Sequence, residues 1–273
     1  MTDLFNQYKV TINAALEASD AIMDIYAGDF ERIEKTDGSP VTIADLTASK
    51  IIRKHLITTG IPITGEEVEK HPYSERKHWT QVWCVDPLDG TKEFIKKNGE
   101  FVINIALIEN KKAVFGLIAS PVRREIIIGN QESGAFQMSY EDALNPNRWR
   151  RLKNLSELNK PIQMISSRSH YSGNLLKLAQ SIEKDYGPVE SQAMGSALKF
   201  FELVNNKADV YPRFAPTMEW DIAAGQAIYE AIGGNVINVN TRKPLTYNKE
   251  DLRNPHFIAS NPIINLPFDS FHQ

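Results

Sequence analysis

The chain has 273 residues, which is enough for one large domain or for two closely packed layers of roughly 100–150 residues each. Hydrophobic residues make up 42% of it and charged residues 24%, with both signs interspersed, and this composition excludes an intrinsically disordered chain. The formal net charge of −3 offers no broad basic surface to a nucleic-acid polymer, so an anionic ligand would need a local cluster or metal ions.

The single cysteine, Cys84, excludes an internal disulfide and a metal-thiolate site, and it suits a reducing compartment. The first residues have neither the basic start nor the apolar run of a signal peptide, and no apolar stretch approaches the roughly 18 residues of a membrane span. We therefore expect a cytoplasmic protein without a transmembrane segment.

The first 130 residues predict two helices followed by a sheet. Apolar residues spaced by three or four predict a helix over 3–27, and a Thr-x-x-Asp capping pattern at Thr42 and Asp45 opens a second helix that ends at Gly60. Strands are then predicted at 61–64, 81–85, 101–109, 113–120 and 125–129, the last three as an antiparallel meander. The two helices are expected to cover this sheet.

The polar segment 139–160 contains Asn-Pro-Asn and is predicted to be a connecting excursion between two halves, residues 1–138 and 161–273. After it, predicted strands at 162–166, 189–193, 208–211 and 235–239 alternate with predicted helices at 174–184, 196–205 and 221–231. The expected fold class is α/β, a layered sandwich in which helices cover a mixed, largely antiparallel sheet and a second, smaller α/β half packs against it.

The most informative segment is Asp-Pro-Leu-Asp-Gly-Thr at residues 86–91, where an apolar strand runs into two carboxylates on either side of a proline turn. Gly90 permits close backbone approach, and a helix beginning at Thr91 would direct its first amides toward a bound anion. Two hard carboxylates beside such a helix end suit Mg²⁺ and phosphate. The alternative is that Asp86 and Asp89 only cap and shape the turn.

Three other segments carry acids in similar positions. Glu66 stands in Gly-Glu-Glu after a short apolar run, and Asp221 stands in Trp-Asp-Ile-Ala-Ala-Gly, where three small residues let another element approach. Asp45 ends the segment 35–45. Each acid has a simpler alternative, namely a solvated loop for Glu66, a helix cap for Asp221 and half of a capping box for Asp45.

Taken together and in this order, the four segments resemble the inositol monophosphatase superfamily of Mg²⁺-dependent, lithium-sensitive phosphatases. Residues 86–101, 167–170, 195–200 and 211–221 are further similar to its 3′(2′),5′-bisphosphate nucleotidases of the CysQ type, and the resemblance covers essentially the whole chain. It implies an enzyme that removes the 3′-phosphate of adenosine 3′,5′-bisphosphate, a product of sulfate-donor metabolism, and leaves AMP. Peripheral contact with the cytoplasmic side of the inner membrane stays open.

The resemblance also implies the metal ligands. One magnesium ion would be held by Glu66, Asp86 and the carbonyl of Leu88, and a second by Asp86, Asp89 and Asp221, with Asp86 shared between them. Two ions in such a site would activate the attacking water and take charge from the leaving oxygen.

Thr91 and Glu66 would orient the attacking water, with Asp45 either behind Thr91 or near a third, weaker ion. The amides of Gly90 and Thr91 would hold phosphate oxygens. The residues implied to contact substrate on this side are Glu66, Leu88, Asp89, Gly90, Thr91 and Asp221.

For the second phosphate, the resemblance implies a pocket built from Ser196, Lys199 and Arg213 with His170 nearby. An ammonium and a guanidinium can pair with phosphate. The alternative for Lys199 and Arg213 is that each is a solvated surface charge. Two other functions stay open, a phosphatase for inositol or sugar monophosphates and a non-catalytic nucleotide-sensing module on the same fold.

Overall fold

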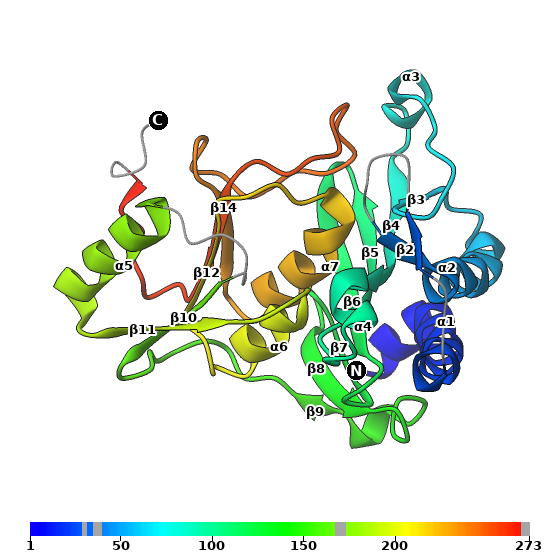
Figure 1. Ribbon diagram of the computed structural model, residues 1–273, viewed down its shortest axis with the longest axis horizontal. Helices are drawn as coiled ribbons and strands as arrows, with labels where there is room; N and C mark the ends of the chain where they lie inside the picture. The colour runs from blue at the N-terminus through cyan, green and yellow to red at the C-terminus, as the bar shows by residue number, and fades with distance from the viewer. Residues whose placement is uncertain (29–31, 35–39, 167–172, 269–273) are drawn as a thin grey trace.

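The computed structural model describes residues 1–28, 32–34, 40–166 and 173–268, so His170 lies outside the described residues. The helices in this part of the chain are α1 (Thr2–Ala27), α2 (Ile43–Leu56), α3 (Tyr73–Arg76), α4 (Thr91–Ile95), α5 (Gly173–Tyr186), α6 (Leu198–Val204) and α7 (Glu219–Glu230), with 3-10 turns at Ile57–Thr59 and Pro146–Arg148. Helices and two large sheets form alternating layers (Figure 1). This layered arrangement confirms the predicted fold class.

The first large sheet contains seven strands that follow one another in chain order. They are β3 (Ile63–Gly65), β4 (Gln81–Asp89), β5 (Val102–Glu109), β6 (Lys112–Ser120), β7 (Glu125–Asn130), β8 (Gly134–Ser139) and β9 (Arg150–Arg151). β3 is parallel to β4 and every later pair is antiparallel, as expected for a meander. The sequence does not predict β8 or β9, and β9 lies inside 139–160, so this segment also extends the sheet. The division into two halves stays a prediction.

Helices α1 and α2 cover one face of this sheet (Figure 1). The predicted apolar stripe of α1 is buried, including Leu4 and Ile12. The predicted capping box of α2 is also present, because the Thr42 N–H donates to Asp45 Oδ2 (2.7 Å) and the Ala44 N–H donates to Thr42 Oγ1 (3.2 Å). Ahead of α2, β1 (Arg32–Glu34) and β2 (Pro40–Thr42) form a small antiparallel pair.

The second large sheet has the strand order β11-β10-β12-β14-β13. Its strands are β10 (Ile162–Ser166), β11 (Val189–Ala193), β12 (Val210–Arg213), β13 (Asn235–Asn238) and β14 (Phe257–Ser260). β10 is parallel to both of its neighbours, whereas β14 is antiparallel to β12 and β13. The sequence does not predict β14. It also places a helix start at Ser196, but Ser196 has a φ of +45° and α6 begins at Leu198.

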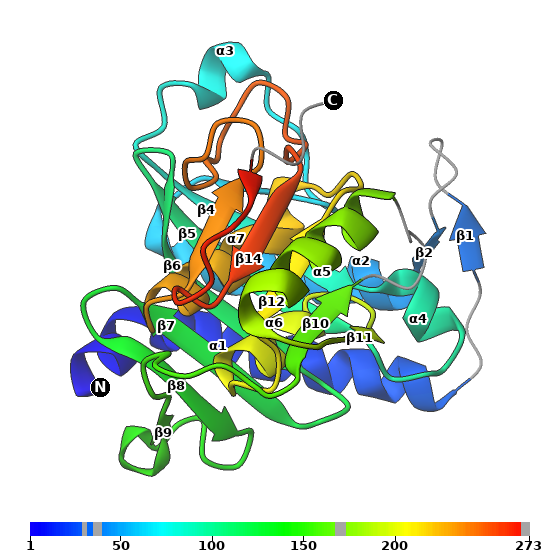
Figure 2. The same cartoon turned by 90° about the vertical axis from the view of Figure 1, so that its left-hand side faces the viewer.

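Helices α6 and α7 lie between the two large sheets, and α5 covers the outer face of the second sheet (Figures 1 and 2). A Cβ on Gly116 of β6 would lie 2.1 Å from the carbonyl oxygen of Ala224, so only glycine allows α7 to approach the strand this closely. This contact confirms the expectation that small residues after Asp221 let another element approach. No helix in the described ranges is both long and apolar enough to span a membrane.

Candidate active site

Glu66 and Asp86 lie next to each other at the ends of two parallel strands. Gly65 of β3 pairs with Val85 of β4, and the Glu66 N–H donates to the Val85 carbonyl (3.2 Å). Glu66 therefore follows Gly65, and Asp86 follows its partner Val85. The two acids lie side by side at the same end of the two strands. A Cβ on Gly65 would lie 2.0 Å from the Val85 oxygen, which explains the glycine that precedes Glu66.

A bulge in β4 brings Asp86 and Asp89 to the same side. Asp86 pairs with Asn104 and Asp89 with Val102, so three residue steps on β4 face two on β5. In a regular strand, residues three apart would point to opposite faces of the sheet. Proline at position 87 supplies no amide to the ladder, and the Asp86 carboxylate accepts the Leu88 N–H (3.0 Å) instead.

Asp221 comes from the second half of the chain, in the first turn of α7. Its Oδ2 accepts the Met218 N–H (2.9 Å), so the simpler capping role is real. The same carboxylate also lines the pockets described below. Capping and ligand binding are therefore compatible for this residue, since each uses different lone pairs of the carboxylate.

Thr91 and Asp45 form a direct contact, which is the arrangement expected for the first of the two places that the resemblance implies for Asp45. The Thr91 hydroxyl donates to Asp45 Oδ1 (2.9 Å), while Asp45 Oδ2 accepts from both the amide and the hydroxyl of Thr42 (2.7 and 2.6 Å). Burial raises the pKa of Asp45, and the hydrogen bonds from Thr42 and Thr91 act in the opposite direction. The capping box thus fixes a buried acid directly behind Thr91.

All of these acids except Asp45 line one hollow, which we call the carboxylate pocket. Its lining includes every predicted metal ligand, namely Glu66, Asp86, Leu88, Asp89 and Asp221, together with Gly90 and Thr91. Burial, followed by the charges of Glu66, Asp89 and Asp221, raises the pKa of Asp86 well above its ordinary value. Burial also raises the pKa of Asp89 to about 6 and, together with the charge of Asp89, raises that of Asp221 well above its ordinary value.

Burial is the main cause of the raised pKa values of Asp86, Asp89 and Asp221, and the charges of neighbouring acids add to it. Nevertheless, in the described part of the chain no group of three or more His, Cys, Asp or Glu side chains has the arrangement of a metal site. The ligand set therefore remains a prediction.

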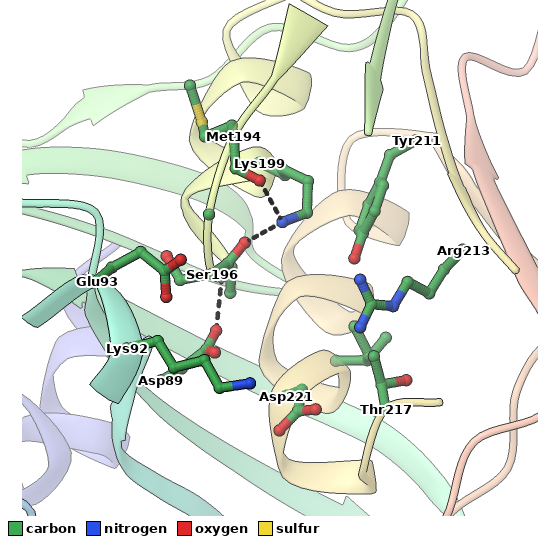
Figure 3. Close-up of a pocket in the computed structure, with 13 residues that line it drawn as sticks. Asp89, Lys92, Glu93, Met194, Ser196, Lys199, Tyr211, Arg213, Thr217 and Asp221 are labelled. Carbon is green, nitrogen blue, oxygen red and sulfur yellow. Dashed lines mark hydrogen bonds between the residues drawn. The ribbon is translucent and has the colours of Figure 1, made fainter. Parts of the chain in front are cut away.

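A second hollow adjoins the first, and we call it the cationic pocket. Ser196, Lys199 and Arg213 line it, and it shares Asp89, Lys92, Glu93 and Asp221 with the carboxylate pocket. Figure 3 shows Lys92 and Glu93 on one wall, and Tyr211, Arg213 and Thr217 on the opposite wall. Ser196, Lys199 and Arg213 thus lie next to the predicted metal ligands and are not remote from them.

Lys199 is buried, with 3% of its surface exposed, so the alternative of a solvated surface charge is wrong for this residue. Its Nζ donates to the carbonyls of Met194 (3.1 Å) and Ser196 (2.5 Å) and lies 5.0 Å from the centre of the Tyr211 ring (Figure 3). Burial lowers the pKa of Lys199 to about 8, against the charge of Asp89, which raises it.

Arg213 is half-buried at the end of β12, and its Nη2 donates to the Pro216 carbonyl (3.0 Å). The Asp89 carboxylate, in turn, accepts the Ala197 N–H (2.6 Å), which joins the carboxylate pocket to the loop that carries Ser196 (Figure 3). Lys92 and Glu93 line both pockets, yet the sequence assigns them no role. Their position directly after Thr91, within a segment already singled out, is the signal that could have identified them.

Comparison with known proteins agrees with this architecture. The sequence pattern of the inositol monophosphatase family matches residues 3–267. A protein of Escherichia coli strain K12 named 3′(2′),5′-bisphosphate nucleotidase CysQ is 37% identical over 251 residues, which are 90% of this chain and 96% of that protein. The protein of the same name from Salmonella typhimurium is 38% identical over 255 residues, 89% of this chain and 95% of that protein.

Solved structures show the same relationship. The crystal structure of CysQ from Bacteroides thetaiotaomicron, described as a bacterial member of the inositol monophosphatase family, has a TM-score of 0.83 and 39% identity, covering 95% of this chain and 98% of that one. The suhB protein of Bartonella henselae has a TM-score of 0.71 at 22% identity, covers 94% of each chain and supports the fold alone. The chain therefore belongs to the inositol monophosphatase family.

Proposed function

We propose that the chain is a magnesium-dependent phosphatase that hydrolyses adenosine 3′,5′-bisphosphate at its 3′-phosphate and gives AMP and inorganic phosphate. The observation that carries the proposal is the direct contact between the carboxylate pocket and the cationic pocket, which share Asp89 and Asp221. A substrate with two phosphates can place one in each pocket. The relatives named 3′(2′),5′-bisphosphate nucleotidase, at 37–38% identity over most of the chain, support the same substrate class.

The carboxylate pocket suits a hard divalent cation. Its candidate ligands are all oxygen atoms, from Glu66, Asp86, Asp89, Asp221 and the carbonyl of Leu88, and oxygen is the donor that magnesium prefers. Burial and, after it, the charges of neighbouring acids raise the pKa of Asp86, and a bound cation would favour its ionised form against both. When bound, magnesium, as two ions in this proposal, would lower the pKa of the attacking water and stabilise charge on the leaving oxygen.

Thr91 and Asp45 would orient the attacking water. Because the Thr91 hydroxyl donates its only proton to Asp45, its oxygen lone pairs are available to accept a hydrogen bond from water. Glu66, which lines the same pocket, would accept a second hydrogen bond from that water. The water oxygen forms a bond to phosphorus and the bond from phosphorus to the ribose 3′-oxygen breaks. One proton of the attacking water is released and the departing 3′-oxygen takes up one proton, so the protons balance. Gly90 has a left-handed conformation at the start of α4, and the amides of Gly90 and Thr91 would hold phosphate oxygens.

The cationic pocket would hold the 5′-phosphate. Ser196 supplies a hydroxyl, and Lys199 and Arg213 supply positive charge.

The volume of the carboxylate pocket, about 550 Å³, lies within the roughly 300–1,000 Å³ typical of sites for small ligands. A small nucleotide fits this scale.

The test is phosphate release from adenosine 3′,5′-bisphosphate and from inositol 1-phosphate, with magnesium and again with excess chelator. We expect the nucleotide to be the better substrate, chelation to abolish the activity, and lithium to inhibit at concentrations where sodium does not. A preference for inositol 1-phosphate would instead favour a phosphatase for inositol or sugar monophosphates. No release from either substrate would favour a non-catalytic nucleotide-sensing module.

A further inference from the structure

The turn at residues 98–101 places Glu100 next to Gly195, which lines the cationic pocket. The Asn98 side-chain oxygen accepts the Glu100 N–H (3.0 Å), and the next residue, Phe101, is fully buried against Phe94 of α4, with ring centres 5.1 Å apart. The backbone of Glu100 also packs on the turn that carries Asp89, because a Cβ on Gly90 would lie 2.7 Å from the Glu100 carbonyl oxygen. The backbone of Glu100 is thus held in place by contacts with residues of the first half of the chain.

The Glu100 side chain reaches the second half of the chain. Its Oε2 accepts the Gly195 N–H (2.8 Å), and this residue begins the loop that presents Ser196. A Cβ on Gly195 would lie 2.9 Å from both Glu100 Oε2 and Glu93 Cγ. The loop therefore rests directly on these two acids, and only glycine permits the contact without displacing either of them.

The other end of the same loop is held in a similar way. The Ala197 N–H donates to Asp89 Oδ2 (2.6 Å), and the carbonyls of Met194 and Ser196 accept from Lys199. Between these anchors, Ser196 is held with a φ of +45°, a conformation that a non-glycine residue adopts only when its surroundings impose it. The carboxylates of Glu100 and Asp89 thus accept hydrogen bonds from the amides on either side of Ser196.

We infer that Glu100 is a positioning residue that determines the preference for substrates with two phosphates. It holds the Ser196 loop at a fixed place relative to Asp89, and this sets the distance between the two phosphate positions. The inference rests on the proposed function. Glu100 touches no reacting atom in this account and would act only through the Gly195 amide.

The experiment compares the wild type with Glu100→Ala, Glu100→Gln, Gly195→Ala and a matched control, Glu141→Ala, which removes only an exposed ion pair with Arg124. The readout is kcat/KM, resolved into kcat and KM, for adenosine 3′,5′-bisphosphate and for 3′-AMP, which lacks the 5′-phosphate. We expect Glu100→Ala to lower the ratio of the two kcat/KM values about tenfold, mainly through KM for the bisphosphate, since about 1.4 kcal/mol corresponds to a factor of ten.

Glu100→Gln keeps an oxygen acceptor for the Gly195 amide and is expected to restore the ratio to within about threefold of wild type. Gly195→Ala should lower the ratio as Glu100→Ala does, and this variant tests the contact even if Glu100→Ala fails to fold. A ratio unchanged in both Glu100→Ala and Gly195→Ala would overturn the inference. An increase of this ratio in both Glu100 variants would also overturn the inference, because it would mean that Glu100 acts only by repelling the second phosphate. Failure of the wild type to hydrolyse the bisphosphate would instead refute the proposed function.

Discussion

The two pockets of the site share Asp89, Lys92, Glu93 and Asp221, but only the cationic pocket adds Lys199 and Arg213 to these groups. In the carboxylate pocket, burial and mutual repulsion raise the pKa of Asp86, Asp89 and Asp221, so the pocket favours a cation. In the cationic pocket, burial lowers the pKa of Lys199, and the charge of Asp89 acts against this effect. The shared wall therefore joins the two pockets electrostatically as well as in space. Asp89 belongs to both, and changes there should affect both.

The largest effect is expected from Asp89→Asn. The substitution keeps an oxygen for the Ala197 amide but removes one ligand charge, so we expect kcat to fall more than about a hundredfold for every substrate while the fold is retained. The measurement is turnover together with the melting temperature. Asp142→Asn, which weakens only a surface contact with Arg148, is the control. Normal turnover in a variant that melts at a lower temperature would make Asp89 a turn-shaping residue only.

Thr91→Val should have the second-largest effect on activity, and this effect should come from the carboxylate pocket alone. It removes the hydroxyl held by Asp45 at nearly the same volume, and a positioned proton acceptor contributes at least about a hundredfold to rate. We expect kcat to fall by about this factor with KM little changed, as measured by steady-state kinetics. Thr58→Val, at an exposed position where the hydroxyl only bonds the His55 carbonyl, provides the comparison. An unchanged kcat would exclude a role for Thr91 in orienting water.

Lys199→Ala and Arg213→Ala should affect the cationic pocket selectively. Charge-assisted hydrogen bonds are worth on the order of 1.5–3 kcal/mol each, so each variant should lower the ratio of kcat/KM for adenosine 3′,5′-bisphosphate to that for 3′-AMP by about ten- to a hundredfold. The exposed Lys207→Ala serves as the control for loss of a positive charge in the same half. Equal losses for both nucleotides would show that these residues do not distinguish the second phosphate.

The smallest expected effect is a pH dependence of the same ratio. Because burial lowers the pKa of Lys199 from 10.5 to about 8, the charged fraction of this lysine falls from about nine tenths at pH 7 to about one tenth at pH 9. The preference for the bisphosphate should therefore decline severalfold as pH rises through 8, in kcat/KM values that report on the free enzyme. Lys199→Met should abolish this decline. A profile that is flat in wild type, or equally steep in Lys199→Met, would assign the titration elsewhere.

Much of the carboxylate pocket could be predicted from sequence because its residues stand in short, local patterns. Asp86, Pro87 and Asp89 lie within one strand end, and the capping pattern at Thr42 already places Asp45 on the first turn of α2. The long helices and the central meander were also predictable, since their apolar spacing is regular, whereas the short α3 was not predicted. Local spacing could not predict the bulge that brings Asp86 and Asp89 to one side, because it depends on pairing with β5.

The cationic pocket depends on contacts that are distant in sequence. The burial of Lys199 follows from packing against Tyr211 of β12, and its segment does not reveal this. The link from Glu100 to Gly195 spans 95 residues, and no local pattern predicts it. β14 was missed for a related reason, because its place between β12 and β13 is set by tertiary packing.

The most direct test of the account is the preference of the wild-type enzyme for a second phosphate. The values of kcat/KM for adenosine 3′,5′-bisphosphate and 3′-AMP should be measured with saturating magnesium at pH 7. We expect a preference for the bisphosphate of about tenfold or more, because the cationic pocket adds charge-assisted hydrogen bonds that 3′-AMP cannot make. Equal values for the two nucleotides would contradict the claim that the adjoining pockets bind two phosphates of one substrate.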